Sequence, residues 1–220
     1  MTDDFTPTSG AATVDALRVS PLSDLAAAFE AADVAGARGV RLREIPFPAQ
    51  VNLRLDALHE TAARRIGAVL GAELPTLPNT VAQTAGGHVL WLGPDEWLIV
   101  SPGGEAAPIE SALRSALECA QTDHAGSSVV NVSAARSVLE LSGPSARGVL
   151  EKGCALDLHP ATFRPGRCAQ TLVSRVEVIL HQTTDTTCRL FVRSSFARYL
   201  ALWLLDAMGE YRHPALEELA

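Results

Sequence analysis

The chain has 220 residues, with 18 basic and 25 acidic side chains and a formal net charge of −7. An acidic chain without basic clusters lacks the electrostatic attraction that drives binding to nucleic acids or to anionic membranes, so both are excluded as expected partners. The hydrophobic fraction of 47% and the charged fraction of 20% are typical of soluble globular proteins, and the length is sufficient to bury a core without disulfides.

The segments that usually determine location give a consistent prediction. The longest apolar run, 199–205, is far shorter than the roughly 18 residues needed to span a bilayer. Acidic residues stand near the N-terminus where a signal peptide has positive charge, and no apolar segment follows them. The four cysteines, at 119, 154, 168 and 188, form no C-x-x-C motif and are expected to be reduced core residues. We therefore expect a cytoplasmic protein.

The first half of the chain combines helical and strand-like patterns. Residues 1–19 lack periodicity and are predicted to be a flexible tail, as are residues 213–220. Between them, proline and glycine mark helix ends and period-two alternation marks strands. The elements predicted here are a helix from Pro21 to Gly36, strands at 40–45 and 51–55, a helix capped by Asp56 and ended by Gly71, a hairpin of 89–92 with 97–100, and a helix from Pro108.

The second half has the same mixture and ends in a strongly amphipathic helix. Its predicted elements are strands at 129–132 and 137–142, a helix over 144–153, strands at 167–173, 175–180 and 187–192, and a last helix from Ser194 or Ser195 to Gly209. Strands joined by hairpins and irregularly interleaved with helices favour an α+β fold of mostly antiparallel sheet. We predict one unit, 20–212, made of two interlocked lobes at about 38–125 and 126–210.

Searches for catalytic and cofactor motifs are negative. The sequence His59-Glu60 begins an H-E-x-x-H zinc motif, but Ala63 occupies the position of the second histidine. Gly143 and Gly148 have the spacing of a phosphate-binding loop, yet Val149 and Leu150 replace the lysine and hydroxyl residue that contact phosphate and magnesium. The sequence also lacks G-x-G-x-x-G and G-x-S-x-G. No catalytic, cofactor-binding or metal-binding residue is therefore predicted.

Two segments combine bulky apolar with polar groups, as the rim of a protein interface does. They are the hairpin around 93–96 and the start of the last helix at 195–198. The residues predicted to face a partner are Trp91, Glu96, Trp97, Phe196 and Arg198. Ordinary turn and helix-cap chemistry is the simpler alternative for both segments.

Four segments in a fixed order carry a family resemblance. They are 91–98 (WLGPDEWL), Asn131-Val132-Ser133 followed by 139–144 (LELSGP), 153–160 (GCALDLHP) and 193–197 (RSSFA). Together they resemble the gamma subunit of bacterial heterotetrameric sarcosine oxidase, from about Pro21 to Glu210. Residues 141–146 (LSGPSA) are similar to a segment of the folate-binding aminomethyltransferase of the glycine cleavage system, the T-protein, which implies a T-protein-like fold for the unit at 20–212.

The resemblance implies a function that the motif search alone does not. It implies a non-catalytic structural subunit of a complex that demethylates sarcosine oxidatively to glycine, forms hydrogen peroxide and transfers the one-carbon unit to tetrahydrofolate. The implied partners are the alpha, beta and delta subunits, and the FAD, FMN, NAD and tetrahydrofolate would be bound by partner subunits. Two alternatives remain: a folate-type small-molecule-binding domain, and the equivalent subunit of a related N-methyl amino acid oxidase.

Overall fold

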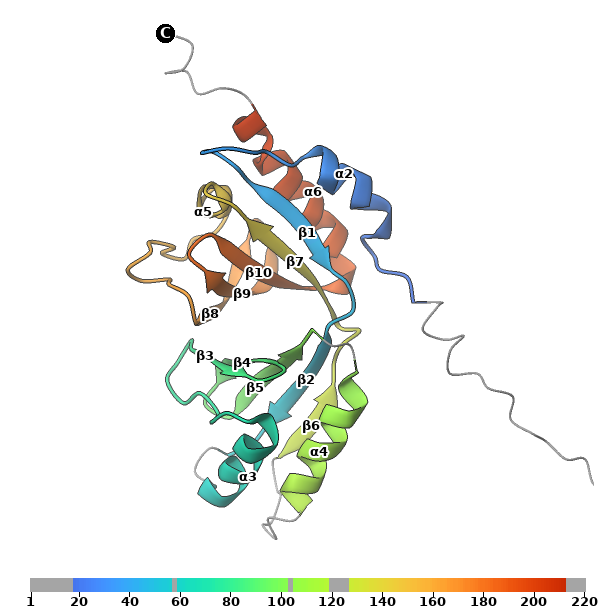
Figure 1. Ribbon diagram of the computed structural model, residues 1–220, viewed down its shortest axis with the longest axis vertical. Coiled ribbons are helices and arrows are strands. Elements are labelled where there is room, and N and C mark those ends of the chain that lie inside the picture. The colour runs from blue at the N-terminus through green and yellow to red at the C-terminus, as the bar shows by residue number, and fades with distance from the viewer. Residues whose placement is uncertain (1–17, 57–58, 103–104, 119–126, 213–220) are drawn as a thin grey trace, which may run out of the picture.

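The computed structural model describes residues 18–56, 59–102, 105–118 and 127–212. Two five-stranded antiparallel sheets form a lower and an upper lobe (Figure 1). The lower lobe contains β2 (Ala49–Arg54), α3 (Glu60–Leu70), β3 (Val81–Thr84), β4 (Gly87–Gly93), β5 (Glu96–Ser101), α4 (Ala106–Glu118) and β6 (Ser128–Asn131). The upper lobe contains η1 (Ser23–Leu25), α2 (Ala26–Ala31), β1 (Arg41–Ile45), β7 (Arg136–Ser142), α5 (Ala146–Glu151), β8 (Arg167–Val173), β9 (Val176–Thr184), β10 (Thr187–Arg193), η2 (Ser194–Phe196), α6 (Ala197–Ala207) and η3 (Gly209–Arg212).

The strand order shows how the lobes are interlocked. The upper sheet has the order β1-β7-β10-β9-β8 and the lower sheet β3-β4-β5-β2-β6. β1 lies inside the predicted first lobe, 38–125, but pairs with β7 of the upper sheet. β6 lies inside the predicted second lobe, 126–210, but pairs with β2 of the lower sheet. The observed boundaries therefore differ from the predicted ones, because the chain starts the upper lobe, builds the lower one and returns.

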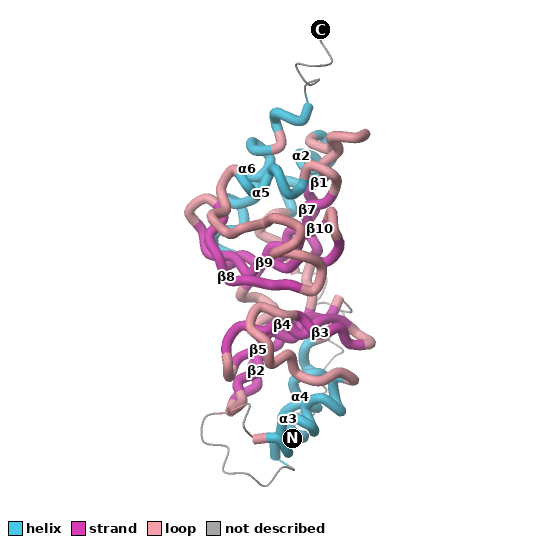
Figure 2. The backbone as a smooth tube through the Cα atoms, turned by 90° about the vertical axis from the view of Figure 1, so that its left-hand side faces the viewer, coloured by secondary structure: helices cyan, strands magenta, loops and turns pink. Residues whose placement is uncertain are grey.

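Both faces of each sheet are covered, which explains the nearly continuous apolar strands. On β5, Trp97 and Ile99 pack with the lower-lobe helices, whereas Leu98 and Val100 point toward the upper sheet. The inner faces meet in what we call the interlobe cluster, which consists of Leu90, Leu92, Leu98, Val100, Val138, Cys168, Ile179 and Phe191. Figure 2 shows the result, with helices toward the two ends of the molecule and strands between them.

Hydrogen bonds join the lobes at the edge of the interlobe cluster. The Val81 amide donates to the Gly166 carbonyl at 3.0 Å, and the Cys168 amide donates to the Asn79 carbonyl at 3.0 Å. The Gln170 side-chain amide donates to the Leu92 carbonyl at 2.9 Å. Polar backbone groups at this edge are thereby satisfied without water, so the sheets are fixed relative to each other.

Most predicted elements are present, with differences at their ends. The helix expected at Asp56 begins at Glu60, and the amide of the preceding His59 donates to the Asp56 carbonyl at 3.0 Å. The helix expected from Pro108 begins at Ala106, and the one expected over 144–153 spans only 146–151. β3 was not predicted, because its four residues are at most half-buried and show no clear alternation. The predicted tails at 1–17 and 213–220 lie outside the described residues.

A close backbone contact joins the two segments of the upper lobe. Gly143 has φ of 114°, and a Cβ atom there would lie 2.5 Å from the Gly39 carbonyl oxygen. Beside it, the Ser145 amide donates to the same Gly39 carbonyl at 3.0 Å. Only glycine permits both the backbone angle and this approach.

Within the described part of the chain, no helix is long and apolar enough to cross a membrane.

Candidate functional site

The predicted hairpin residues lie in and beside the lower-lobe core. Trp97 is 1% exposed, and its indole N–H donates to the Pro75 carbonyl at 2.8 Å. Trp91 pairs directly with Trp97 across β4 and β5 and is partly buried against the same core. The Glu96 carboxylate accepts hydrogen bonds from Asn52 and Arg54, both at 2.8 Å. In this chain, therefore, Trp97 acts as a core residue and Glu96 fixes neighbouring strands.

The other two predicted residues lie on the upper lobe, so the structure does not bring the five together. Phe196 is 49% exposed in η2, directly before α6 begins. Arg198 is exposed and forms an ion pair with Asp24 of η1. This ion pair ties the start of α6 to the N-terminal segment of the upper lobe.

An exposed apolar surface extends from Phe196 along α6. Tyr199 and Leu202 are 42% and 46% exposed, and with Phe196 they form what we call the α6 surface. The Tyr199 hydroxyl lies 2.8 Å from the Ser174 hydroxyl in the β8–β9 turn, which holds the ring in place. Sequence reasoning missed Tyr199 and Leu202, although the uninterrupted apolar run 199–205 indicated that α6 has more apolar positions than one buried face can hold.

Groups that could perform acid–base or nucleophilic chemistry are buried in uncharged forms. Burial, with help from His88 and Arg189, lowers the pKa of His181 to about 3. The His88 and His181 rings meet edge to face across the lobes, with centroids 4.9 Å apart. Burial raises the pKa of the Cys168 and Cys188 thiols to about 12. At neutral pH these groups are therefore a neutral imidazole and two unreactive thiols.

Three of the four cysteines lie in the described part of the chain. Cys154, Cys168 and Cys188 are free and buried, as expected, and Cys119 lies outside the described residues. A search for groups of three or more metal-ligating side chains among those residues finds none.

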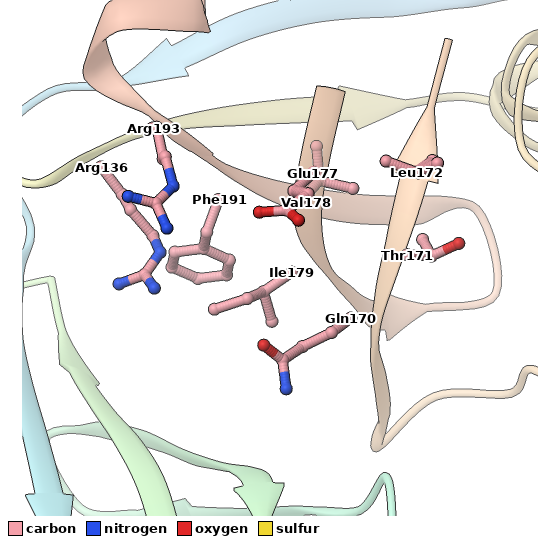
Figure 3. Close-up of a pocket in the computed structure, with 9 residues that line it drawn as sticks. All are labelled: Arg136, Gln170, Thr171, Leu172, Glu177, Val178, Ile179, Phe191 and Arg193. Atoms are coloured by element: carbon pink, nitrogen blue, oxygen red, sulfur yellow. The ribbon is translucent and has the colours of Figure 1, made fainter. Parts of the chain in front are cut away.

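A cavity of about 380 Å³ opens on the inner face of the upper sheet (Figure 3). Its wall carries Phe191 and Ile179 of the interlobe cluster, and two arginines, Arg136 and Arg193, line one side. Gln170 and Glu177 line it from β8 and β9. Apolar walls with a few charged groups are typical of small-molecule sites. Sequence reasoning missed this cavity because no local motif contains its residues.

Comparisons with known proteins agree with the resemblance found in the sequence. The model of the "Sarcosine oxidase, gamma subunit family" matches residues 54–210. The chain is 42% identical over 196 residues to the sarcosine oxidase gamma subunit of Corynebacterium sp. (strain U-96), covering 89% of this chain and 92% of that one. It is 41% identical to the gamma subunit from Arthrobacter sp., covering 91% and 94% of the two chains.

Solved structures confirm the predicted fold. A chain of the heterotetrameric sarcosine oxidase from Corynebacterium sp. U-96, in complex with pyrrole 2-carboxylate, superposes with a TM-score of 0.82 at 39% identity and covers 91% of this chain and 99% of that one. The glycine cleavage system aminomethyltransferase T from Bartonella henselae matches with a TM-score of 0.60 at 16% identity, covering 87% and 58%. The second match shows a shared fold alone.

Proposed function

Since the chain belongs to the sarcosine oxidase gamma subunit family, we propose that it is a non-catalytic structural subunit of a heterotetrameric sarcosine oxidase. The complex would demethylate sarcosine oxidatively to glycine, form hydrogen peroxide and transfer the one-carbon unit to tetrahydrofolate. The observation that carries the proposal is the length of the similarity: it covers both lobes and nearly the whole of the gamma subunits compared.

The chemistry of the buried side chains supports a structural role. A general base needs a pKa near the working pH, and a nucleophilic cysteine needs an accessible thiolate. His181 and the thiols of Cys168 and Cys188 have pKa values shifted away from neutrality in the unreactive direction. These residues serve packing, and catalysis is assigned to the partners.

The partners in this proposal are the alpha, beta and delta subunits, acting in the cytoplasm. They would bind the FAD, FMN, NAD and tetrahydrofolate. This assignment extends the family resemblance, together with a sequence that lacks the glycine-rich dinucleotide motif.

The α6 surface is the proposed contact with another subunit. Phe196, Tyr199 and Leu202 expose about half of their surfaces on one helical segment, while the opposite face of α6 is buried in the upper lobe. Aromatic residues with a polar tip are enriched in interface cores because they bury a large area and still satisfy a hydrogen bond. Arg198, held by Asp24, lies at the polar edge of this surface.

Co-expression tests the structural role. The other three subunits are produced with and without this chain, and the yield, thermal midpoint and sarcosine-dependent peroxide formation of the complex are measured. We expect the complex to lose yield and thermal stability without the chain. Full stability and activity in its absence would contradict the proposal.

A matched pair of leucine variants tests the contact surface. Leu202→Asp places a charge on the α6 surface, whereas Leu77→Asp places the same charge at a 69% exposed leucine in the lower lobe. We expect Leu202→Asp to prevent co-purification with the partners and Leu77→Asp to leave it intact. Equal co-purification of both variants would show that the contact lies elsewhere, without affecting the co-expression result.

A further inference from the structure

The cavity on the inner face of the upper sheet contains an unusual pair of charges. Arg193 of β10 pairs directly with Arg136 of β7 in the antiparallel register, so the two side chains extend from opposed positions into the same cavity. Like charges directly opposite each other on a sheet are destabilising. Figure 3 shows the two guanidinium groups together beside the Phe191 ring.

The same two strands provide an internal comparison. Four residues earlier on β10, Arg189 pairs with Glu140 of β7, and their side chains form an ion pair at 3.0 Å. Opposite Arg193, the β7 residue is Arg136, where Arg189 has a glutamate opposite it. Within the described residues, no ion pair joins either Arg136 or Arg193 to an acid. The positive charge at this end of the ladder is therefore left without the compensation found at Arg189.

Two acids lie near this charge, and neither forms an ion pair with Arg136 or Arg193. Glu96 attracts Arg136 electrostatically, but its two carboxylate oxygens are already bonded to Asn52 and Arg54. Burial and the neighbouring Arg193 together lower the pKa of Arg136. Glu177 lines the cavity from β9, where the β9–β10 register continues from Val178 opposite Val192 and places it beside Arg193, but no ion pair joins the two side chains.

The shape of the cavity fits a small organic molecule. Its volume of about 380 Å³ lies within the usual range of ligand pockets, roughly 300–1,000 Å³. Phe191 is 1% exposed and anchored in the interlobe cluster, so its ring offers a rigid apolar wall. Ile179 continues that wall. An apolar body can pack here while one end reaches the arginines.

We propose that this cavity binds a small organic monocarboxylate, whose carboxylate lies on Arg136 and Arg193 and whose apolar body packs on Phe191. Guanidinium groups bind carboxylates through paired, charge-assisted hydrogen bonds, and two of them suit a single anionic group. Glu177, beside Arg193, leaves the two arginines and one acid with a formal net charge that matches a single carboxylate, so a second negative charge on the ligand is disfavoured. The proposal concerns a ligand site within this chain and is independent of its structural role.

The position of binding is tested by crystallography. Crystals of the full-length chain, together with whatever partners co-purify, are soaked with 4-bromobenzoate, and the bromine is located by its anomalous signal. We expect bromine in the cavity and the carboxylate within hydrogen-bond distance of Arg136 and Arg193. A cavity without bromine, or one already filled by a partner's acidic side chain, would overturn the proposal.

The chemistry of recognition is tested in solution with two probes. Titration of the same protein is expected to give tighter binding for 4-(aminomethyl)benzoate than for terephthalate, because Glu177 offsets one of the two arginine charges and the cavity then balances only one carboxylate. Arg136→Gln and Arg193→Gln are each expected to weaken binding of 4-(aminomethyl)benzoate at least about tenfold, since each removes a charge-assisted hydrogen bond. Glu177→Gln is expected to abolish the preference between the probes.

Controls separate recognition from folding. Arg164→Gln removes an exposed arginine away from the cavity lining and should leave the affinity unchanged. The unfolding midpoints of Arg136→Gln and Arg193→Gln should be no lower than that of the unmodified chain, because each relieves the repulsion between paired cations. Unchanged affinity in both arginine variants, or an equal loss in Arg164→Gln, would show an adventitious additive only.

Discussion

The two lobes share an architecture but differ in how the chain builds them. The described lower-lobe strands and helices all lie between Ala49 and Asn131, whereas the upper lobe joins β1 to strands that begin at Arg136. Pairing Arg41 with Ser142 closes a long loop, which costs conformational entropy before its contacts form. The upper lobe therefore depends on the pairing of β1 with β7, a strand from beyond the lower lobe, whereas the lower lobe is closed by β2, which pairs with β5 and β6 of its own continuous segment.

The largest effect should come from the contact that the lobes share. Phe191→Ala removes the largest side chain of the interlobe cluster and leaves a cavity, so we expect the free energy of unfolding to fall by about 3–5 kcal/mol. Denaturant unfolding measures the loss of stability, and hydrogen exchange shows which strands lose protection.

Phe196→Ala is the matched control, because it truncates a half-exposed phenylalanine and should cost less than about 1 kcal/mol. We expect Phe191→Ala to weaken protection of both β5 and β10. Weakened protection in the upper lobe alone would contradict a shared core.

The contact between Gly143 and Gly39, which joins the two segments of the upper lobe, should be the next most important for stability. Gly143→Ala forces an L side chain to adopt φ of 114° and places its Cβ atom 2.5 Å from the Gly39 carbonyl oxygen, so we expect a loss of at least about 2 kcal/mol. Gly71→Ala is the comparison variant, since its φ is 69° but no atom lies within 4 Å of the added Cβ. Gly71→Ala should reduce stability by only about 1 kcal/mol, which is the cost of holding an L residue in the left-handed backbone region. Equal losses of stability in the two variants, measured by thermal unfolding, would mean that the close contact between Gly143 and Gly39 does not contribute to the effect.

Acid should weaken the contact between the lobes by a smaller amount. The pKa of His181 is about 3 in the folded chain and 6.5 when exposed, so only the unfolded state takes up the proton between these values. Stability is therefore lost as the pH falls below about 6.5, by about 2 kcal/mol between pH 7 and pH 5. Unfolding curves at both pH values measure the loss.

His181→Gln removes the titrating group and should flatten this part of the pH dependence. The remaining slope should reflect His88, whose pKa is also lowered by burial and by Arg189. A variant with the full slope of the unmodified chain would exclude His181 as its source.

The smallest effect is expected at the exposed charges of the lower lobe. Arg54 lies 2.8 Å from Glu96 and 3.6 Å from Asp95, and about half of its side chain is exposed. Surface ion pairs contribute little, so Arg54→Gln should reduce stability by less than about 1 kcal/mol at low salt. The difference should shrink at high salt, where such pairs are screened. A difference that persists at 1 M salt would indicate packing by the arginine stem instead.

How much the sequence could predict differs between local and non-local features. The hairpin around Gly93 was predicted from two apolar runs joined by a Gly-Pro-Asp turn and the helix α6 from its helical periodicity, and both are present. Period-two alternation identified β1 as a strand and a short apolar run identified β6, but neither pattern shows which strands pair. For this reason both were assigned to the wrong lobe.

The candidate sites show the same limit. Trp97 was among the residues predicted to face a partner, but its burial and its hydrogen bond to the Pro75 carbonyl depend on how the segment between α3 and β3 folds back. Arg136 and Arg193 lie far apart in the sequence, and only the β7–β10 register places them opposite each other. Tyr199 and Leu202 could be recognised as surplus apolar residues on a helix, although their exposure required the packing of α6 to be known.

The two crossings between the lobes lie side by side. Gln50, at the start of β2, accepts a backbone hydrogen bond from Val132 at 2.8 Å and donates its own amide to Ser133 Oγ at 2.9 Å. Its side chain donates to the Arg136 carbonyl at 2.9 Å, where β7 begins. Two hydrogen-bonded chain segments therefore connect the lobes, instead of one flexible linker. This double connection resists twisting, so a partner that binds only one lobe would also fix the orientation of the other lobe.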